Sequence, residues 1–202
     1  MNFRDTKKPR RFLVYCLSSA IVFFAGAFVV RADVKTWQLD PDHSDAHFQV
    51  RHLGITNVQG DFPKLSGTLR IDDQDLSKSA VDVTIDVTSI YTRVPDRDKD
   101  LRGSDFFDVA KYPTATFHST QIVKTANGAA KMTGDLTLHG TTKSVTFDVQ
   151  GPTAPVMFMG EWHRGATATT TIKRRDFGVS GDYPTVSDDV LLTLDVDMIP
   201  KK

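Results

Sequence analysis

The chain has 202 residues, a length typical of one domain, with 25 basic residues, 25 acidic residues and one cysteine, Cys16. Residues 1–32 hold six of the basic residues and one of the acidic residues, so the remainder has 19 basic and 24 acidic residues and a net charge of −5. This charge gives no electrostatic basis for binding nucleic acid or an anionic membrane surface, and a single cysteine excludes an internal disulfide.

Residues 1–32 have the order of a secretory signal peptide. A basic start is followed by an apolar run from Phe12 to Val30, and Val30-Arg31-Ala32 suits a signal peptidase. We expect cleavage, export to the periplasm, and a mature domain over residues 33–202. The alternative is an uncleaved membrane anchor, because the 19 residues of the apolar run are just enough to span a bilayer.

Beyond residue 43, apolar and polar residues alternate in segment after segment. Eight strands are predicted, over residues 44–53, 65–72, 79–91, 114–124, 130–139, 143–150, 163–173 and 189–199. Strict alternation indicates strands with one dry and one wet face, as antiparallel sheets allow. We therefore expect an all-β protein in which eight antiparallel strands close into a barrel, since closure removes exposed strand edges. A two-sheet sandwich is the alternative.

The segment 95–113 breaks this alternation and predicts one or two short helices. Pro95 suits the first position of a helix over residues 96–102. Ser104 is a candidate cap for a second helical turn, which Pro113 would end.

The residue types favour binding over catalysis. Gly178-Val179-Ser180-Gly181 lacks the second glycine of a nucleophile elbow, and no glycine-rich phosphate loop is present, so we expect no enzyme and no cofactor. His43 and His47 would lie about 13 Å apart on one strand, whereas a zinc ligand nitrogen lies about 2 Å from the metal. We therefore expect no metal site, although pairing over long range is left open for His118, His139 and His163.

Several local strings, in their order and spacing, resemble the YceI-like family over residues 37–199. They include Trp37-x-Leu39-Asp40-x-x-His43-Ser44, Phe48-x-Val50-x-His52-Leu53, Asp105-Phe106-Phe107-Asp108-Val109-x-Lys111-Tyr112-Pro113, Gly134-Asp135-Leu136-Thr137-Leu138-His139-Gly140 and Asp176-Phe177-Gly178. The resemblance implies a lipocalin-like antiparallel barrel, usually periplasmic, that binds polyisoprenoid or similar long-chain amphiphiles in its lumen.

The dry strand faces predict the side chains that would line this lumen and contact an apolar tail. They are Phe48, Val50, Val83, Ile85, Phe117, Leu136, Leu138, Val145, Phe147, Phe177, Leu192 and Leu194. Near the mouth, Arg97, Asp98, Phe106 and Phe107 form either a lid over the barrel or a solvated helix. Arg174 is either a contact for a polar head group or a surface residue.

Binding would have to come from burial of a long tail. Each CH₂ group contributes about 0.8 kcal/mol, against an association cost of roughly 4–15 kcal/mol, so tails well beyond ten carbons are favoured. We expect a carrier of a long-chain isoprenoid or quinone-like amphiphile, with the membrane only as the source of the lipid. If phenylalanine side chains fill the lumen, the alternative is a ligand-free interaction or stress-protective scaffold. The sequence leaves a homodimer open.

Overall fold

The computed structural model describes residues 34–202, and the predicted signal peptide lies outside the described residues. This part of the chain contains one α-helix, α1 (Pro95–Arg102), and four short 3₁₀ turns at Leu76–Lys78, Val87–Ser89, Ala126–Gly128 and Arg174–Phe177. Its strands are β1 (Lys35–Leu39), β2 (Asp45–His52), β3 (Thr56–Phe62), β4 (Leu65–Ile71), β5 (Ala80–Asp86), β6 (Thr114–Lys124), β7 (Ala129–Leu138), β8 (Thr141–Gln150), β9 (Val156–Phe158), β10 (Glu161–Lys173) and β11 (Val186–Pro200). No helix within residues 34–202 is long and apolar enough to cross a lipid bilayer.

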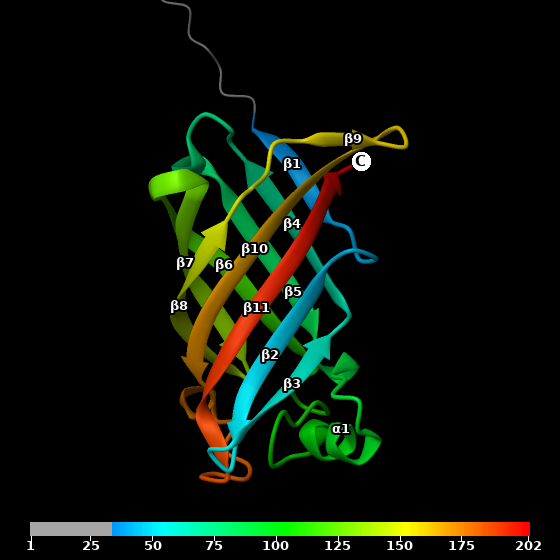
Figure 1. Cartoon of the computed structure of the whole chain (residues 1–202), viewed down its shortest axis with the longest axis vertical. Helices are drawn as coiled ribbons and strands as arrows, with labels where there is room; N and C mark the ends of the chain where they lie inside the picture. The colour runs from blue at the N-terminus through cyan, green and yellow to red at the C-terminus, as the bar shows by residue number, and fades with distance from the viewer. Residues whose placement is uncertain (1–33) are drawn as a thin grey trace, which may run out of the picture. The chain divides into compact units, whose positions relative to one another are not determined.

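The strands form a closed antiparallel barrel (Figure 1). On one side, β11 pairs with β10; on its other side it pairs with β1 and β2, which follow one another along the same edge. In the same way, β4 pairs with β1 and β3 pairs with β2. The circuit continues through β5, β6, β7 and β8 back to β10. The barrel therefore has eight strands around its circumference, two of them interrupted, which confirms the predicted eight-stranded architecture over the sandwich.

Each predicted strand overlaps an observed one, but three strands were not predicted. These are β1 and β9, which have only five and three residues, and β3, which carries Gly60 at an inward position where alternation requires an apolar side chain. The strand predicted over residues 79–91 ends earlier, at Asp86, because the Asp86 carboxylate accepts a hydrogen bond from the Thr88 N–H and turns the chain. The predicted second helical turn after Ser104 is a series of irregular turns, so α1 is the single α-helix of the described chain.

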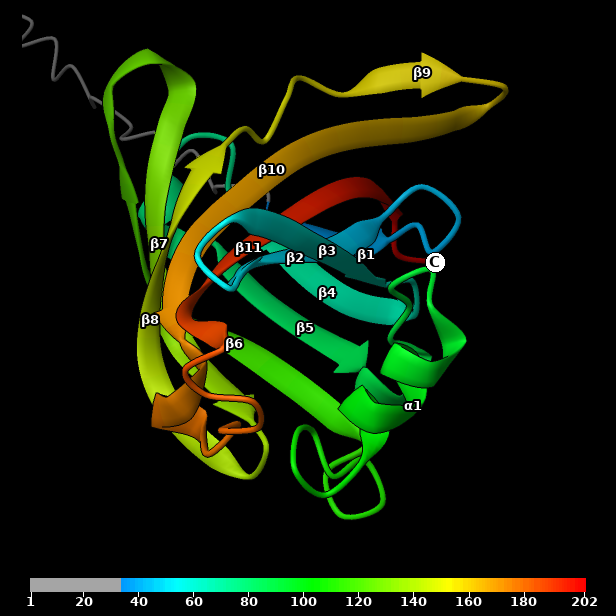
Figure 2. The ribbon, with the colours of Figure 1, turned by 60° about the horizontal axis from the view of Figure 1, so that its bottom comes forward.

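The predicted inward face is the observed one. All twelve predicted lumen residues belong to the two apolar clusters of the barrel interior or pack against them. One cluster lies at the end that α1 covers, and Figure 2 shows this end from below. The other cluster fills the opposite end and is built around the buried side chains of Trp37, Leu39, Leu65, Leu69, Ile71 and Met198.

Two aromatic rings of the interior lie directly on glycines of a neighbouring strand. A Cβ atom at Gly60 would lie only 2.4 Å from Cζ of Phe48, and one at Gly134 would lie 2.5 Å from Cζ of Phe117. Distances this short are not tolerated between carbon atoms, so the ring positions require glycine here. Gly60 and Gly134 thus let the two rings lie flat against the barrel wall.

Candidate functional site

The barrel encloses a cavity of about 290 Å³ at the end that α1 covers. This volume is near the lower end of ligand pockets, which run from roughly 300 to 1,000 Å³. Seven of the twelve predicted lumen residues line it: Phe48, Val50, Ile85, Leu136, Leu138, Leu192 and Leu194. Apolar side chains from several strands therefore converge on one space inside the barrel.

The other five predicted lumen residues lie in the interior without lining this cavity. Phe117 and Phe147 pack edge to face, with ring centroids 5.2 Å apart. Phe177 is almost fully buried, and Val145 packs against the same cluster. Val83 belongs to the cluster at the opposite end, beside a second cavity of about 90 Å³. The lumen is thus partly filled by side chains and partly open.

Polar side chains are concentrated at the α1 end of the larger cavity. They are His52, Thr92, Arg97, Asp100, Arg174 and Asp182, whereas His47 touches the cavity but turns its side chain outward to Asp61. Because the rest of the wall is apolar, the cavity has the polarity of an amphiphile, with an apolar interior and a polar rim.

Arg174 is the most unusual residue of this rim, because it is a buried cation with only 5% of its surface exposed. Its guanidinium donates three hydrogen bonds to backbone carbonyl oxygens: Nε to Ser187 at 2.9 Å, Nη1 to Val179 at 3.0 Å and Nη2 to Val186 at 3.0 Å. Burial lowers the pKa of Arg174, whereas the more distant charge of Asp188 raises it.

The charge of Arg174 has no ionised partner in direct contact within residues 34–202. A guanidinium has five N–H donors, so two remain after the three carbonyl bonds. A cation in this state favours an anionic or hydrogen-bond-accepting group beside it. Because Arg174 is buried, its interpretation as a surface residue is wrong, and the head-group contact stays a prediction.

Helix α1 is fixed to the end of the barrel by its charged side chains. The buried carboxylate of Asp98 accepts hydrogen bonds from the backbone N–H of Thr92, at 2.8 Å, and from the Thr92 hydroxyl. Arg97 donates to the Thr92 carbonyl oxygen at 2.7 Å. Arg102 donates to the carbonyl oxygens of Thr88 and Ile90. These contacts make α1 an attached cover and not a freely solvated helix.

The predicted mouth residues have different positions in this cover. Phe106 and Phe107 line the cavity, and the ring of Phe107 packs edge to face on Phe62 with centroids 5.8 Å apart. Arg97 also lines the cavity. Asp98 does not line the cavity, but its carboxylate accepts a hydrogen bond from the N–H of Thr92, which does. Four of the five predicted mouth residues thus face the cavity, namely Arg97, Phe106, Phe107 and Arg174.

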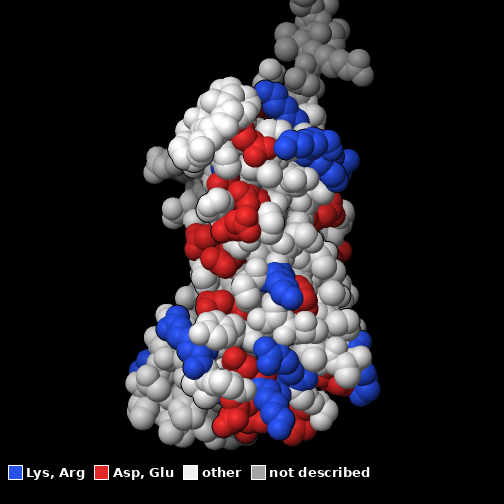
Figure 3. All heavy atoms as spheres, turned by 90° about the vertical axis from the view of Figure 1, so that its right-hand side faces the viewer, with Lys and Arg blue, Asp and Glu red and all other residues white. Residues whose placement is uncertain are grey.

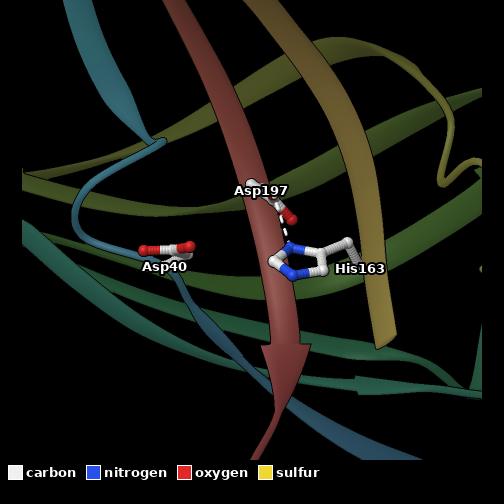
Figure 4. Close-up of side chains that lie close together, drawn as sticks. All are labelled: Asp40, His163 and Asp197. Carbon is white, nitrogen blue, oxygen red and sulfur yellow. Dashed lines mark hydrogen bonds and ion pairs between the residues drawn. The ribbon is translucent and has the colours of Figure 1, made fainter. Parts of the chain in front are cut away.

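The histidines occur mostly in separate pairs with aspartates. His43, in the turn between β1 and β2, bonds Asp40, and His47 on β2 bonds Asp61. The hydrogen bond from His43 lowers the pKa of Asp40. At one place the fold brings together three such side chains, those of Asp40, His163 and Asp197 (Figure 4). No spacing in the sequence indicated this group, since its members come from three separate segments.

A further surface feature is the hairpin of β9 and β10, which extends from the barrel wall (Figure 2). It exposes large apolar side chains, namely Val156, Met157, Phe158, Met159 and Trp162. The face of the molecule drawn in Figure 3 has a lobe of uncharged atoms at its upper end, with acidic groups below this lobe.

The model of the YceI-like domain matches residues 37–198. The chain is 35% identical to the YceI protein of Escherichia coli O157:H7 over 191 residues, which cover 92% of this chain and 96% of that protein. Among solved structures, BcnA of Burkholderia cenocepacia is 25% identical with a TM-score of 0.71, covering 79% of this chain and 98% of BcnA. A polyisoprenoid binding domain from Saccharophagus degradans has the same fold, with a TM-score of 0.62 and 18% identity over 82% of this chain and 98% of that domain.

Proposed function

The chain belongs to the YceI-like domain family, and from this premise we propose that it is a periplasmic carrier of a long-chain isoprenoid or similar amphiphilic lipid. The observation that carries the proposal is the cavity inside the barrel, with an apolar wall and a polar rim that contains Arg174. The solved domain from Saccharophagus degradans, which is described as polyisoprenoid binding, supports the same class of ligand.

We place the tail between the inward faces of β2, β7 and β11, against Phe48, Leu138 and Leu192. At about 25 cal/mol per Å² of apolar surface removed from water, binding strength grows with the length of the tail that enters. A tail longer than the larger cavity would extend past Leu194, which lines both cavities, toward the smaller one. A substitution that removes these contacts with the tail tests this placement most directly.

The first experiment narrows the lumen without adding a charge. In Leu192→Trp, the larger ring enters the cavity, and we expect at least a tenfold loss of co-purified lipid. The matched control is Leu191→Trp, because Leu191 is the neighbouring residue on β11 but is 41% exposed on the outer face. Native mass spectrometry and solvent extraction of protein from its own host measure the lipid. Clean extracts from the unmodified protein, with no stabilisation by added prenol or quinone, would end the carrier proposal.

The second experiment concerns the head group. In Arg174→Gln, the buried positive charge at the rim is removed, while two of the five N–H donors are kept on an uncharged amide. A charge-assisted hydrogen bond contributes about 1.5–3 kcal/mol, so retention of lipids with phosphate or phenolic heads should fall about 10- to 100-fold. Retention of a lipid with a hydrocarbon head should stay unchanged. Equal loss of both lipids would mean that Arg174 acts only through the fold.

The competing function is a ligand-free scaffold. The packed end of the lumen, around Trp37 and Met198, favours it, because this end has little open space. Export rests on residues 1–32, and N-terminal sequencing that returned Met1 from the native protein would contradict cleavage. Quinone-like ligands and a homodimer stay predictions, with the apolar β9–β10 hairpin as the surface on which self-association would occur.

A further inference from the structure

Three side chains from adjacent strands meet on the outer face of the barrel. Asp40 directly follows β1, Asp197 lies on β11 and His163 lies on β10. The backbone N–H of Asp40 donates to the carbonyl oxygen of Asp197 at 2.9 Å, and Met198 is paired with both Leu39 and Arg164. Since Leu39, Met198 and Arg164 are buried, their neighbours Asp40, Asp197 and His163 share the opposite, outward face.

The polar atoms of these three side chains converge (Figure 4). One carboxylate oxygen of Asp40, one of Asp197 and a ring nitrogen of His163 all lie within 4.8 Å of one another. Nδ1 of His163 is 3.0 Å from Oδ2 of Asp197. A fourth residue, His43, holds Asp40 from the solvent side, with Nδ1 2.8 Å from Oδ2 of Asp40.

The group has an excess of negative charge. Asp40 and Asp197 lie opposite each other on adjacent strands, and like charges in this position destabilise a sheet. Within the described residues, neither carboxylate forms an ion pair with a lysine or an arginine; their partners are His43 and His163. In addition, Oδ1 of Asp197 is buried and has no hydrogen-bond partner. A buried acceptor without a partner is rare in a folded protein, and a bound ion is one of the few reasons for it.

The backbone holds this arrangement in place. The hydroxyl of Ser44 accepts from the N–H of Asp197 at 3.0 Å and donates to its carbonyl oxygen at 3.1 Å. Asp197 is therefore fixed between β1 and β10, and the side chains are 13–27% exposed, so an ion from solvent can reach them.

From this geometry we propose that Asp40, His163 and Asp197 bind one divalent transition-metal ion, for which Zn²⁺ is the best fit. Imidazole nitrogen with carboxylate oxygen is a donor set that zinc takes, at bond lengths of about 2.0–2.2 Å. The ligand atoms of a tetrahedral site with these bond lengths are about 3.3 Å apart. Side-chain rotations that move the three ligand atoms closer by about 1.5 Å or less are therefore enough to close the site. Water would occupy the fourth position, and His43 would orient Asp40 as an outer-shell partner.

A metal ion here departs from the expectation of no metal site, which rested on the distance between His43 and His47 and left only long-range pairing of residues such as His163 open. The ion would join β1, β11 and β10 beside the base of the β9–β10 hairpin. A ligand that binds only the folded state stabilises it, so zinc should raise the melting temperature of the protein.

The test is isothermal titration of zinc into the full protein, purified without an affinity tag and freed of metal with EDTA. We expect one Zn²⁺ per chain, and at least tenfold weaker binding in both His163→Ala and Asp197→Asn. The matched control is His118→Ala, because His118 forms a similar pair with Asp82 that has no third ligand nearby among residues 34–202. Binding of Co²⁺ should give the intense visible absorption of a tetrahedral site.

Two outcomes would overturn the proposal: no stoichiometric binding by the unmodified protein, or unchanged affinity in His163→Ala. Circular dichroism of each variant shows whether it is folded, and His163→Gln replaces His163→Ala if that variant is not. The lipid content of His163→Ala should equal that of the unmodified protein, so failure of the metal site and failure of the carrier proposal are distinguishable.

Discussion

Phe147→Ala should lower the free energy of unfolding by about 3–5 kcal/mol, because the change deletes a large buried side chain and leaves a cavity. Phe147 is 4% exposed, and its ring packs edge to face on Phe117 across the interior. Aromatic pairs of this geometry add about 0.5–1.5 kcal/mol beyond burial. Urea denaturation followed by circular dichroism measures the effect, as a lower midpoint with an unchanged slope.

The control for this result is Phe158→Ala. Phe158 lies on β9 and is 64% exposed, so its removal should change the free energy of unfolding by no more than about 0.5 kcal/mol. Equal losses in the two variants would contradict the inward register of β8, since a slip by one residue would turn Phe147 to the outer face.

Asp98→Ala should give the second large effect, a loss of about 2–4 kcal/mol with local opening of the cavity end. The change leaves the buried N–H and hydroxyl of Thr92 without their acceptor, and each unsatisfied buried group costs about 1–3 kcal/mol. Hydrogen exchange should accelerate first in α1 and in residues 88–92, because these segments are joined through Thr92 and Arg102.

Asp96→Ala serves as the control for this opening. Asp96 lies in the first turn of the same helix and is exposed, so only its interaction with the helix dipole is lost, about 0.3–1 kcal/mol. If both variants exchanged equally fast, α1 would not be held by Asp98, and the cover over the cavity would be loose in the native protein.

The barrel could be predicted from the sequence because its strands alternate strictly. Phe147 and Leu192 lie in segments of period two, and this period fixes their direction in any antiparallel barrel. Among the missed strands, β3 is the one in which an inward glycine breaks this rule. At Gly60 the inward position has no side chain, because the ring of Phe48 occupies its place.

The candidate site could be predicted less well, because burial of a charge depends on distant loops. Arg174 and Arg175 are equivalent in the sequence. In the structure, the loop around residues 179–187 brings three carbonyl oxygens to Arg174 and buries it. Arg175 pairs with Asp188 and lies over the ring of Tyr183. Likewise, Asp40, His163 and Asp197 meet only through the register of β11 with both of its neighbours.

The glycines beneath the rings of Phe48 and Phe117 influence the internal width of the barrel. With glycine at position 60, the ring of Phe48 can lie against the barrel wall, and the space beside the ring stays open as part of the cavity. Any larger residue at this position would displace the ring by more than an ångström, and the lumen is the open side. A barrel of the same strands and register with a different residue at such a position would have a lumen of different width.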